Sequence, residues 1–243
     1  MRLASAVLYC ALLVLFLAGG PSEAAEPEMG LPGPGGNPAD IEREVLWLGA
    51  PDFWATAASS EVMGAFDFWT EIASNFELDE AATVRKITWW GTYWNGYEGI
   101  PTGSGFNLRF YMMDGDCLPE PAPFLEYLLA GDDCCETIAE GGDMYSQFVY
   151  EHCFEVPLPA GSYWFSAQMA DHDFPPQWGR QGAEWPYQTC ESAFRSPYFS
   201  YPDWEPYDQG IFEPWWASLM VEDVCEPTAI ETSTWGGIKG LYW

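Results

Sequence analysis

The hydrophobic and polar positions between Val45 and Cys225 fall into short runs that clusters of Gly, Pro, Asn and Asp separate. No stretch shows the sustained 3.6-residue periodicity of an amphipathic helix. The clearest run is Gly105 to Met113, where apolar and polar side chains alternate. Because successive side chains of a strand point to opposite faces, this run predicts a strand that covers a core with Phe106, Leu108, Phe110 and Met112.

A Pro-rich turn separates two further alternating runs. Ser146 to Val156 and Ser162 to Met169 each carry aromatic side chains on one face, and Pro157 to Gly161 lies between them. We therefore expect the two strands to form a hairpin. Further strands are predicted at Phe66 to Leu78, Thr83 to Tyr93, Phe124 to Leu129, and Trp216 to Glu222.

Seven to nine predicted strands favour an all-β fold made of two packed sheets, because a single open sheet would leave one apolar face exposed. We expect an antiparallel β-sandwich of the jelly-roll type. The segment from Trp178 to Pro214 is rich in Trp, Tyr and Pro and alternates little, so it is predicted to form long aromatic loops with short strands. The sequence contains no internal repeat of fixed period, which argues against a propeller or a solenoid.

The N-terminal segment predicts that the protein is exported. Residues 1–24 have a basic start, the apolar run Ala6 to Ala18 and small residues near the end, which is typical of a signal peptide. The run is too short for a membrane-spanning helix, so no membrane insertion is expected. Residues 25–43 are predicted to be a Pro/Gly-rich leader, 44–225 the sandwich domain, and 226–243 a C-terminal tail. We expect a secreted protein, extracellular or at the cell surface.

Six cysteines remain after such processing, which in an oxidising compartment indicates three disulfides. The pairing stays open, although the adjacent Cys134 and Cys135 are expected to bond to two different partners. The six are Cys117, Cys134, Cys135, Cys153, Cys190 and Cys225.

The net charge of −29 argues against nucleic acid and anionic lipid as partners. The acidity can be explained in general by solubility, or more specifically by cation binding to a few grouped carboxylates. The candidate metal ligands are Asp114 and Asp116 around Gly115, and Asp171 and Asp173 around His172. Asp132 and Asp133 form a similar acidic turn. None has the full calcium-loop spacing, so no cofactor is expected, and a structural calcium ion in one of these turns is the alternative.

Residues Ile87 to Gly96, with the sequence ITWWGTYWNG, resemble a segment of uncharacterised secreted β-sandwich proteins of environmental bacteria. The same proteins share four further motifs in the same order, here Phe106 to Tyr111, Asp114-Gly115, Pro159 to Trp164, and Pro175 to Gly179. The resemblance implies a secreted β-sandwich and implies no activity.

Residues Ser233 to Tyr242 are similar to Trp-Gly-x-Ile-Lys-x-Leu-Tyr tails that close other secreted bacterial proteins and look like sorting signals. This chain ends in Trp243 where those tails have a basic residue. The alternative is that the tail packs on the domain as a short amphipathic turn.

Catalysis is not expected. Only His152 and His172 could serve a Ser-His-Asp or Cys-His mechanism, and neither lies near a recognisable nucleophile motif. The carboxylates are too numerous to single out a glycosidase pair.

The aromatic residues are the better clue to function. Alternation sends Trp90 and Trp94 to the face opposite Trp89 and Tyr93, so one set is core and the other lies near a surface. Exposed flat rings could stack on sugars, whereas the favoured alternative is that the aromatic loops cover them. The candidate ligand-binding residues are Trp90, Trp94, Tyr97, Trp178, Trp185 and Trp204.

The sequence therefore predicts a non-catalytic binding or adhesion module for carbohydrate or another cell-surface polymer. A structural subunit of an extracellular layer or filament, with self-association, is the alternative. A secreted hydrolase ranks third.

Overall fold

The computed structural model describes residues 45–52, 57–94, 99–101, 104–133, 135–141, 146–170, 172–184, 189–210 and 214–225. They all belong to the unit formed by residues 42–243. The predicted signal peptide, leader and C-terminal tail lie outside the described residues. Within the described ranges, no helix has the length and apolar character needed to cross a membrane.

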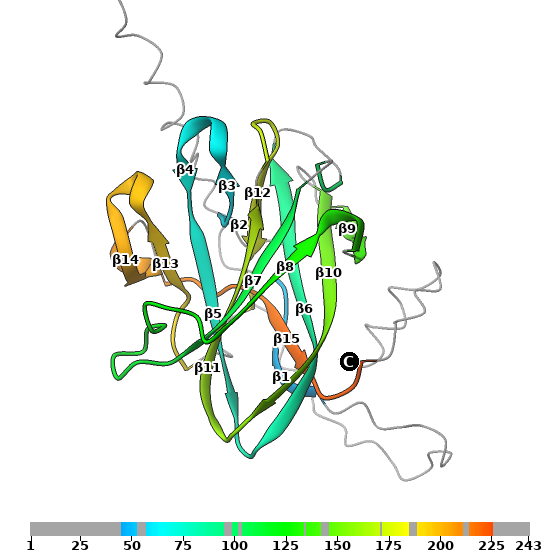
Figure 1. Ribbon diagram of the computed structural model, residues 1–243, viewed down its shortest axis with the longest axis vertical. Helices are drawn as coiled ribbons and strands as arrows, with labels where there is room; N and C mark the ends of the chain where they lie inside the picture. The colour runs from blue at the N-terminus through cyan, green and yellow to red at the C-terminus, as the bar shows by residue number, and fades with distance from the viewer. Residues whose placement is uncertain are drawn as a thin grey trace, which may run out of the picture. The chain divides into compact units, whose positions relative to one another are not determined.

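Two antiparallel sheets pack face to face, which confirms the predicted all-β sandwich (Figure 1). The first, sheet I, has seven strands. Its main order is β1 (Val45–Gly49), β15 (Leu219–Glu222), β6 (Ala82–Trp94), β10 (Ser146–Leu158) and β9 (Cys135–Gly141), and β12 (Gln177–Gln181) joins β6 to β2 (Ala57–Ser59).

Sheet II has six strands. Their order is β14 (Tyr201–Pro206), β13 (Ala193–Ser196), β5 (Glu71–Leu78), β11 (Gly161–Ala170), β7 (Gly105–Met112) and β8 (Leu125–Ala130). A separate small hairpin pairs β3 (Val62–Met63) with β4 (Phe68–Trp69). The short helical turns are η1 (Gly64–Phe66), η2 (Gly131–Asp133), η3 (Pro197–Phe199) and α1 (Tyr207–Gly210).

The predicted hairpin between the strands around Pro157 is wrong. β10 pairs with β6 and β9 in sheet I, whereas β11 pairs with β5 and β7 in sheet II. Crossing between sheets lets the aromatic faces of both strands pack against each other in the interior. Pro159 has no N–H for a hairpin bond, and its carbonyl instead accepts the Tyr163 hydroxyl at 2.9 Å.

The strand predicted at Phe66 to Leu78 is divided into β4 (Phe68–Trp69) and β5, which begins at Glu71. Asp67 ends η1 in the left-handed region, with a φ of 52°, and so interrupts extended backbone there. The connections from β5 to β6 and from β6 to β7 also cross between the sheets, which gives the chain a jelly-roll-like path. The predicted aromatic loop segment contains β12, β13 and β14, as short strands.

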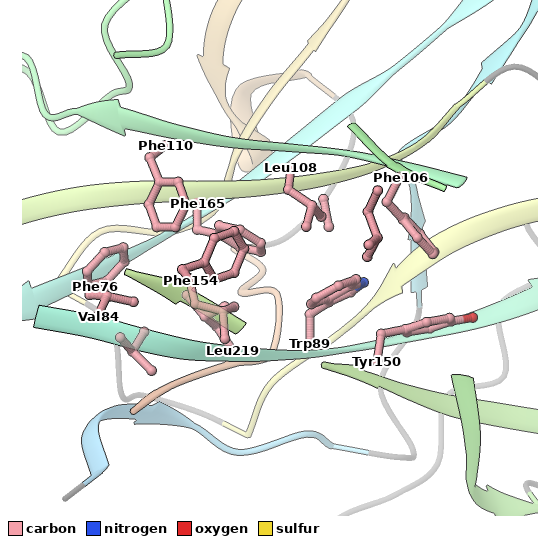
Figure 2. Close-up of a cluster of buried hydrophobic side chains, with 14 of the residues drawn as sticks. Phe76, Val84, Trp89, Phe106, Leu108, Phe110, Tyr150, Phe154, Phe165 and Leu219 are labelled. Carbon is pink, nitrogen blue, oxygen red and sulfur yellow. The ribbon is translucent and has the colours of Figure 1, made fainter. Parts of the chain in front are cut away.

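Aromatic side chains from both sheets fill the interior. Trp89 of β6 stacks on Tyr150 of β10, with ring centroids 5.6 Å apart and planes 13° apart. Its edge meets Phe106 of β7 across the sandwich (Figure 2). Phe110 packs edge-on against Phe154 of the opposite sheet at 5.3 Å. Each such fully buried ring contributes roughly 1.5–3 kcal/mol of hydrophobic stabilisation.

Disulfides Cys117–Cys190 and Cys153–Cys225 confirm the predicted use of cysteine as a covalent staple. Because these four cysteines pair with each other, Cys134 and Cys135 do not tie one loop to two of them, and that prediction is wrong. Cys134 itself lies outside the described residues. Two disulfides are typical of an oxidising compartment.

Candidate binding face

Most of the tryptophans proposed from sequence as sugar platforms are covered. Trp178 is fully buried, and Trp90 and Trp204 are only 7% and 6% exposed. Trp94 is half-buried, and Tyr97 and Trp185 lie outside the described residues. Trp90, Trp178 and Trp204 therefore present no open ring face to a ligand, which corrects their assignment as binding residues.

A reciprocal contact between β6 and β12 fixes the positions of two of these rings, the buried Trp178 and the half-buried Trp94. Trp178 points into the core, where its Nε1 donates to the Tyr150 hydroxyl at 3.0 Å. Its indole lies against Gly91 so closely that a Cβ at residue 91 would overlap the ring. On the other face, the Trp94 indole occupies the space that a Cβ at Gly179 would need. Each strand thus supplies a glycine for the tryptophan of its neighbour.

The outer face of sheet II, away from the core, carries a line of charged side chains across the sheet. We call Glu126, Arg109, Glu71 and Arg195 the polar ladder; they come from β8, β7, β5 and β13. Arg109 donates from Nε to Glu126 at 2.6 Å and from Nη1 to Glu71 Oε1 at 3.1 Å. Arg195 donates from Nη2 at 2.6 Å and from Nε at 3.0 Å to Glu71 Oε2.

The carboxylate of Glu71 is fully buried and is the centre of this network. Besides the two arginines, the Tyr111 hydroxyl donates to Glu71 Oε1 at 2.7 Å. Burial, followed by the nearby Glu71 charge, raises the pKa of Tyr111 well above its ordinary value, so the phenol keeps its proton and remains a donor. Glu71 therefore holds both guanidinium groups in place on the sheet surface.

Arg195 is also held between aromatic rings, which accounts for the position of Trp204. Its guanidinium carbon lies 4.3 Å from the Trp204 ring centroid, 5.1 Å from that of Trp69 and 5.7 Å from that of Tyr111. These are cation–π distances. The space between these aromatic rings is therefore filled by the chain's own arginine.

Buried polar groups without hydrogen-bond partners gather on the same face. Among the described residues they include both side-chain atoms of Asn75, Ser166 Oγ, and the Nε1 atoms of Trp164 and Trp204. Leu118 and the Cys117–Cys190 disulfide lie in the segments that pack over this face. An unpaired buried polar group costs about 1–3 kcal/mol, so this is a region where the fold gives up stability.

The two most exposed aromatic rings among the described residues lie next to each other. Tyr198 and Phe199 of η3 are 51% and 46% exposed. They pack against Phe68 of β4, with ring centroids 4.9 and 5.9 Å away. We call Phe68, Tyr198 and Phe199 the aromatic tip. It adjoins the polar ladder, because Glu71 follows β4 along the chain and pairs with Arg195 just before η3.

The local sequence fixes the aromatic tip in one conformation. Ser196 caps η3 by accepting the Phe199 N–H on its Oγ, and the same Oγ donates to the Trp69 carbonyl at 2.7 Å. Pro197 occupies the first turn, and Ser200 closes it in the left-handed region. Sequence reasoning missed these rings. The signal was present, since two adjacent aromatic residues after a Ser-Pro start cannot both point into one core.

The two histidines have structural neighbours. His172 Nε2 lies 3.1 Å from Glu61 Oε2, and both side chains are fully buried. Glu61 Oε2 also accepts the Trp178 backbone N–H at 2.7 Å, which ties the segment after β11 to β12. His152 packs edge-on against Phe154, and burial lowers its pKa, opposed by the charge of Asp133. His172 is therefore buried beside Glu61, and His152 is partly buried beside Phe154.

The aspartates predicted as metal ligands that the structure describes lie in a turn or a loop. Asp114 Oδ1 accepts the N–H groups of Asp116 at 2.9 Å and Leu118 at 3.1 Å, which is an Asx-type turn. Asp173 is exposed, and Asp171 lies outside the described residues. In the ranges that the structure describes, no group of three or more His, Cys, Asp or Glu side chains is placed to hold a metal ion.

Comparison with protein-family models finds no match for the chain, and comparison with curated proteins finds none either.

Proposed function

We propose that this chain is a secreted, non-catalytic binding module that recognises neutral carbohydrate through its aromatic tip. The observation that carries the proposal is the pair of half-exposed rings, Tyr198 and Phe199, held by a helix cap and by Phe68. Large apolar side chains left open in this way on a stapled sandwich commonly mark an interaction site. Flat rings provide the platform on which a pyranose can stack.

Polar groups near the rings suit a ligand rich in hydroxyl groups. The Tyr198 hydroxyl belongs to the tip itself, and the exposed carboxylate of Asp67 immediately precedes Phe68. A carboxylate accepts hydrogen bonds from sugar hydroxyls, and a phenol both donates and accepts. A ring platform bordered by such groups can both stack a sugar and orient it.

The charge distribution favours a neutral ligand over an anionic one. The chain carries a net charge of −29. Most of the described basic side chains are engaged within the fold: Arg109 and Arg195 bind Glu71, and buried Lys86 lies 2.7 Å from Glu222. Sulfated or uronic-acid polymers would therefore approach a surface of like charge.

The placement of the acid and base groups supports a role in binding without catalysis. Glu61 and Glu71, the carboxylates with the most elaborate hydrogen bonding, are fully buried and cannot reach a substrate. His172 is buried against Glu61. The two disulfides support the secretion that the predicted signal peptide implies.

The test is binding of the chain from Ala25 to Trp243 to an array of neutral and acidic glycans, alongside the double variant Tyr198→Ala, Phe199→Ala. We expect binding to neutral glycans that falls at least about tenfold in the variant, which corresponds to about 1.4 kcal/mol. Both rings are half-exposed, so the variant should keep the wild-type circular dichroism spectrum.

Phe124→Ala is the matched control, because Phe124 is 43% exposed and contacts Phe110 and Tyr163, away from η3. It should bind glycans as the wild type does. Failure of the wild-type chain to bind any neutral glycan, or equal losses in the control and the tip variant, would refute the proposal.

A further inference from the structure

The edge strand β8 is less protected than the other terminal strands of the two sheets. In the described part of the chain its only neighbour is β7. Open edges invite pairing with another chain, and proteins usually blunt them with proline, bulges, charges or short length. β8 has no proline and no bulge, and its one charged residue, Glu126, is paired with Arg109 of β7: the strand runs in unbroken register against β7 from Leu125 to Ala130, and its sequence is LEYLLA.

The other described edges each carry such a feature. β14 contains Pro202 and Pro206, and the pairing registers of β1 and β9 are interrupted by bulges. β9 also carries acidic side chains, and β2 has only three residues. The contrast singles out β8 as the edge that remains able to pair.

The side chains of β8 fit association in a strongly acidic protein. Leu128 lies on the outer face of the strand and is 75% exposed. The single charged residue, Glu126, forms an ion pair with Arg109 at 2.6 Å. A second copy of a chain with a net charge of −29 is repelled over most of its surface, and this strand is locally neutral.

We propose that two copies of the chain pair through β8 as an antiparallel, two-fold symmetric dimer that joins both outer sheets into one. The Gly131 N–H donates to the Ser104 carbonyl at 2.8 Å. Because antiparallel bonding alternates, residues 125, 127 and 129 bond to β7, and Glu126, Leu128 and Ala130 direct their N–H and C=O groups to the open edge.

The two-fold axis passes through Leu128. In that register Leu128 opposes Leu128 of the partner subunit, and Glu126 opposes Ala130 of the partner subunit. No like charges lie directly opposite, which antiparallel pairs otherwise penalise. The strand is thus complementary to itself, which favours a second copy over a foreign peptide as the occupant.

An isologous contact of this kind closes on itself, so it produces a dimer and not a filament. The dimer does not depend on the proposed glycan binding. If both hold, each assembly presents two aromatic tips, and avidity for a repeating polymer exceeds that of one tip.

The first test is sedimentation equilibrium of the chain from Ala25 to Trp243 over a roughly hundredfold dilution series in salt sufficient to screen charge repulsion. We expect a monomer–dimer equilibrium, and a monomer for Leu128→Lys. Ile138→Lys is the matched control, because Ile138 of β9 is 57% exposed at a bulged, acidic edge, and this variant should remain dimeric.

The second test uses cross-linking at the axis. Residues at hydrogen-bonded positions of an antiparallel pair have Cα atoms about 5.5 Å apart, within disulfide range. Leu128→Cys should therefore form a disulfide-linked dimer, whereas Glu126→Cys, which faces Ala130 of the partner subunit, should not. A wild-type chain that stays monomeric throughout, or cross-linking that is equal in the two variants, would overturn the proposal, and neither result depends on glycan binding.

Discussion

The indole of Trp178 lies directly against the backbone of Gly91 on the adjacent strand β6, in the space that a Cβ would need. Trp178 pairs with Tyr93 in the register of β6 and β12, so Gly91 is its diagonal neighbour on the inner face. The Trp-Trp-Gly and Pro-Pro-x-Trp-Gly segments, which are far apart in sequence, therefore meet in one contact. Glycine is required at residue 91 because the ring occupies the side-chain position.

Gly91→Ala should destabilise the fold by about 2–3 kcal/mol, because the new methyl group overlaps a fully buried indole that other core rings hold in place. Urea denaturation followed by tryptophan fluorescence measures the change. Gly115→Ala is the matched control, since a Cβ at Gly115 would meet no heavy atom within 4 Å. Equal losses in the two variants would show that the Trp178 contact is not the cause.

Glu71→Gln should reduce the free energy of unfolding by about 3–5 kcal/mol, because it leaves two partly buried guanidinium groups without their shared carboxylate. Glu126→Gln provides the comparison, since Glu126 is 51% exposed and binds the same Arg109, and it should cost less than about 1 kcal/mol. Chemical denaturation of both variants gives the values. A small loss for Glu71→Gln would mean that Glu71 does not organise the ladder.

Replacing Cys117 and Cys190 by Ser should cost about 2–5 kcal/mol, through the loop entropy that the disulfide removes from the unfolded chain. Replacing Cys153 and Cys225 should cost nearly the same, because the sequence separations are 73 and 72 residues. Calorimetry of both double variants tests this. If one double variant loses clearly more free energy of unfolding than the other, the difference comes from packing in the folded protein and not from the entropy of the unfolded chain.

Deprotonation of Glu191 should lower the free energy of unfolding as the pH rises from about 4.5 to about 7. Burial, followed by a hydrogen bond and repulsion from Asp208, raises the pKa of Glu191 to about 7 from an ordinary value of 4.5. The folded state therefore holds a proton that the unfolded state releases, and the stability present below pH 4.5 is lost through that window.

The loss should be on the order of 1 kcal/mol, less than the full pKa shift would give, because Glu191 is only partly buried and solvent screens its charge. Denaturation midpoints measured at intervals from pH 4.5 to pH 8 follow it. Glu191→Gln should flatten the curve and be relatively more stable at pH 8. An unchanged slope in Glu191→Gln would assign the pH dependence to other carboxylates among the many in the chain.

Alternation along the chain was enough to predict the strands that face the core. Phe106, Leu108 and Phe110 lie inside the sandwich as the pattern requires, whereas Met112, predicted to join them, is 41% exposed at the end of β7. The sequence did not show to which sheet each strand belongs. β10 and β11 have the same alternating pattern whether the two strands pair in one sheet or pack against each other from two sheets. Short strands such as β1, β12 and β13 were missed or left within loops, since a few residues give no measurable period.

The sequence by itself determined the all-β class, the use of disulfides and an acidic protein whose aromatic residues exceed what one strand face can bury. These properties follow from composition and a two-residue period, which act within a few neighbours. Only the tertiary structure decided which rings are covered. Trp178 is sealed by a glycine 87 positions away and Trp204 by an arginine on β13, whereas Tyr198 and Phe199 stay open because η3 turns them outward. Burial depends on contacts between distant segments, which no local pattern encodes.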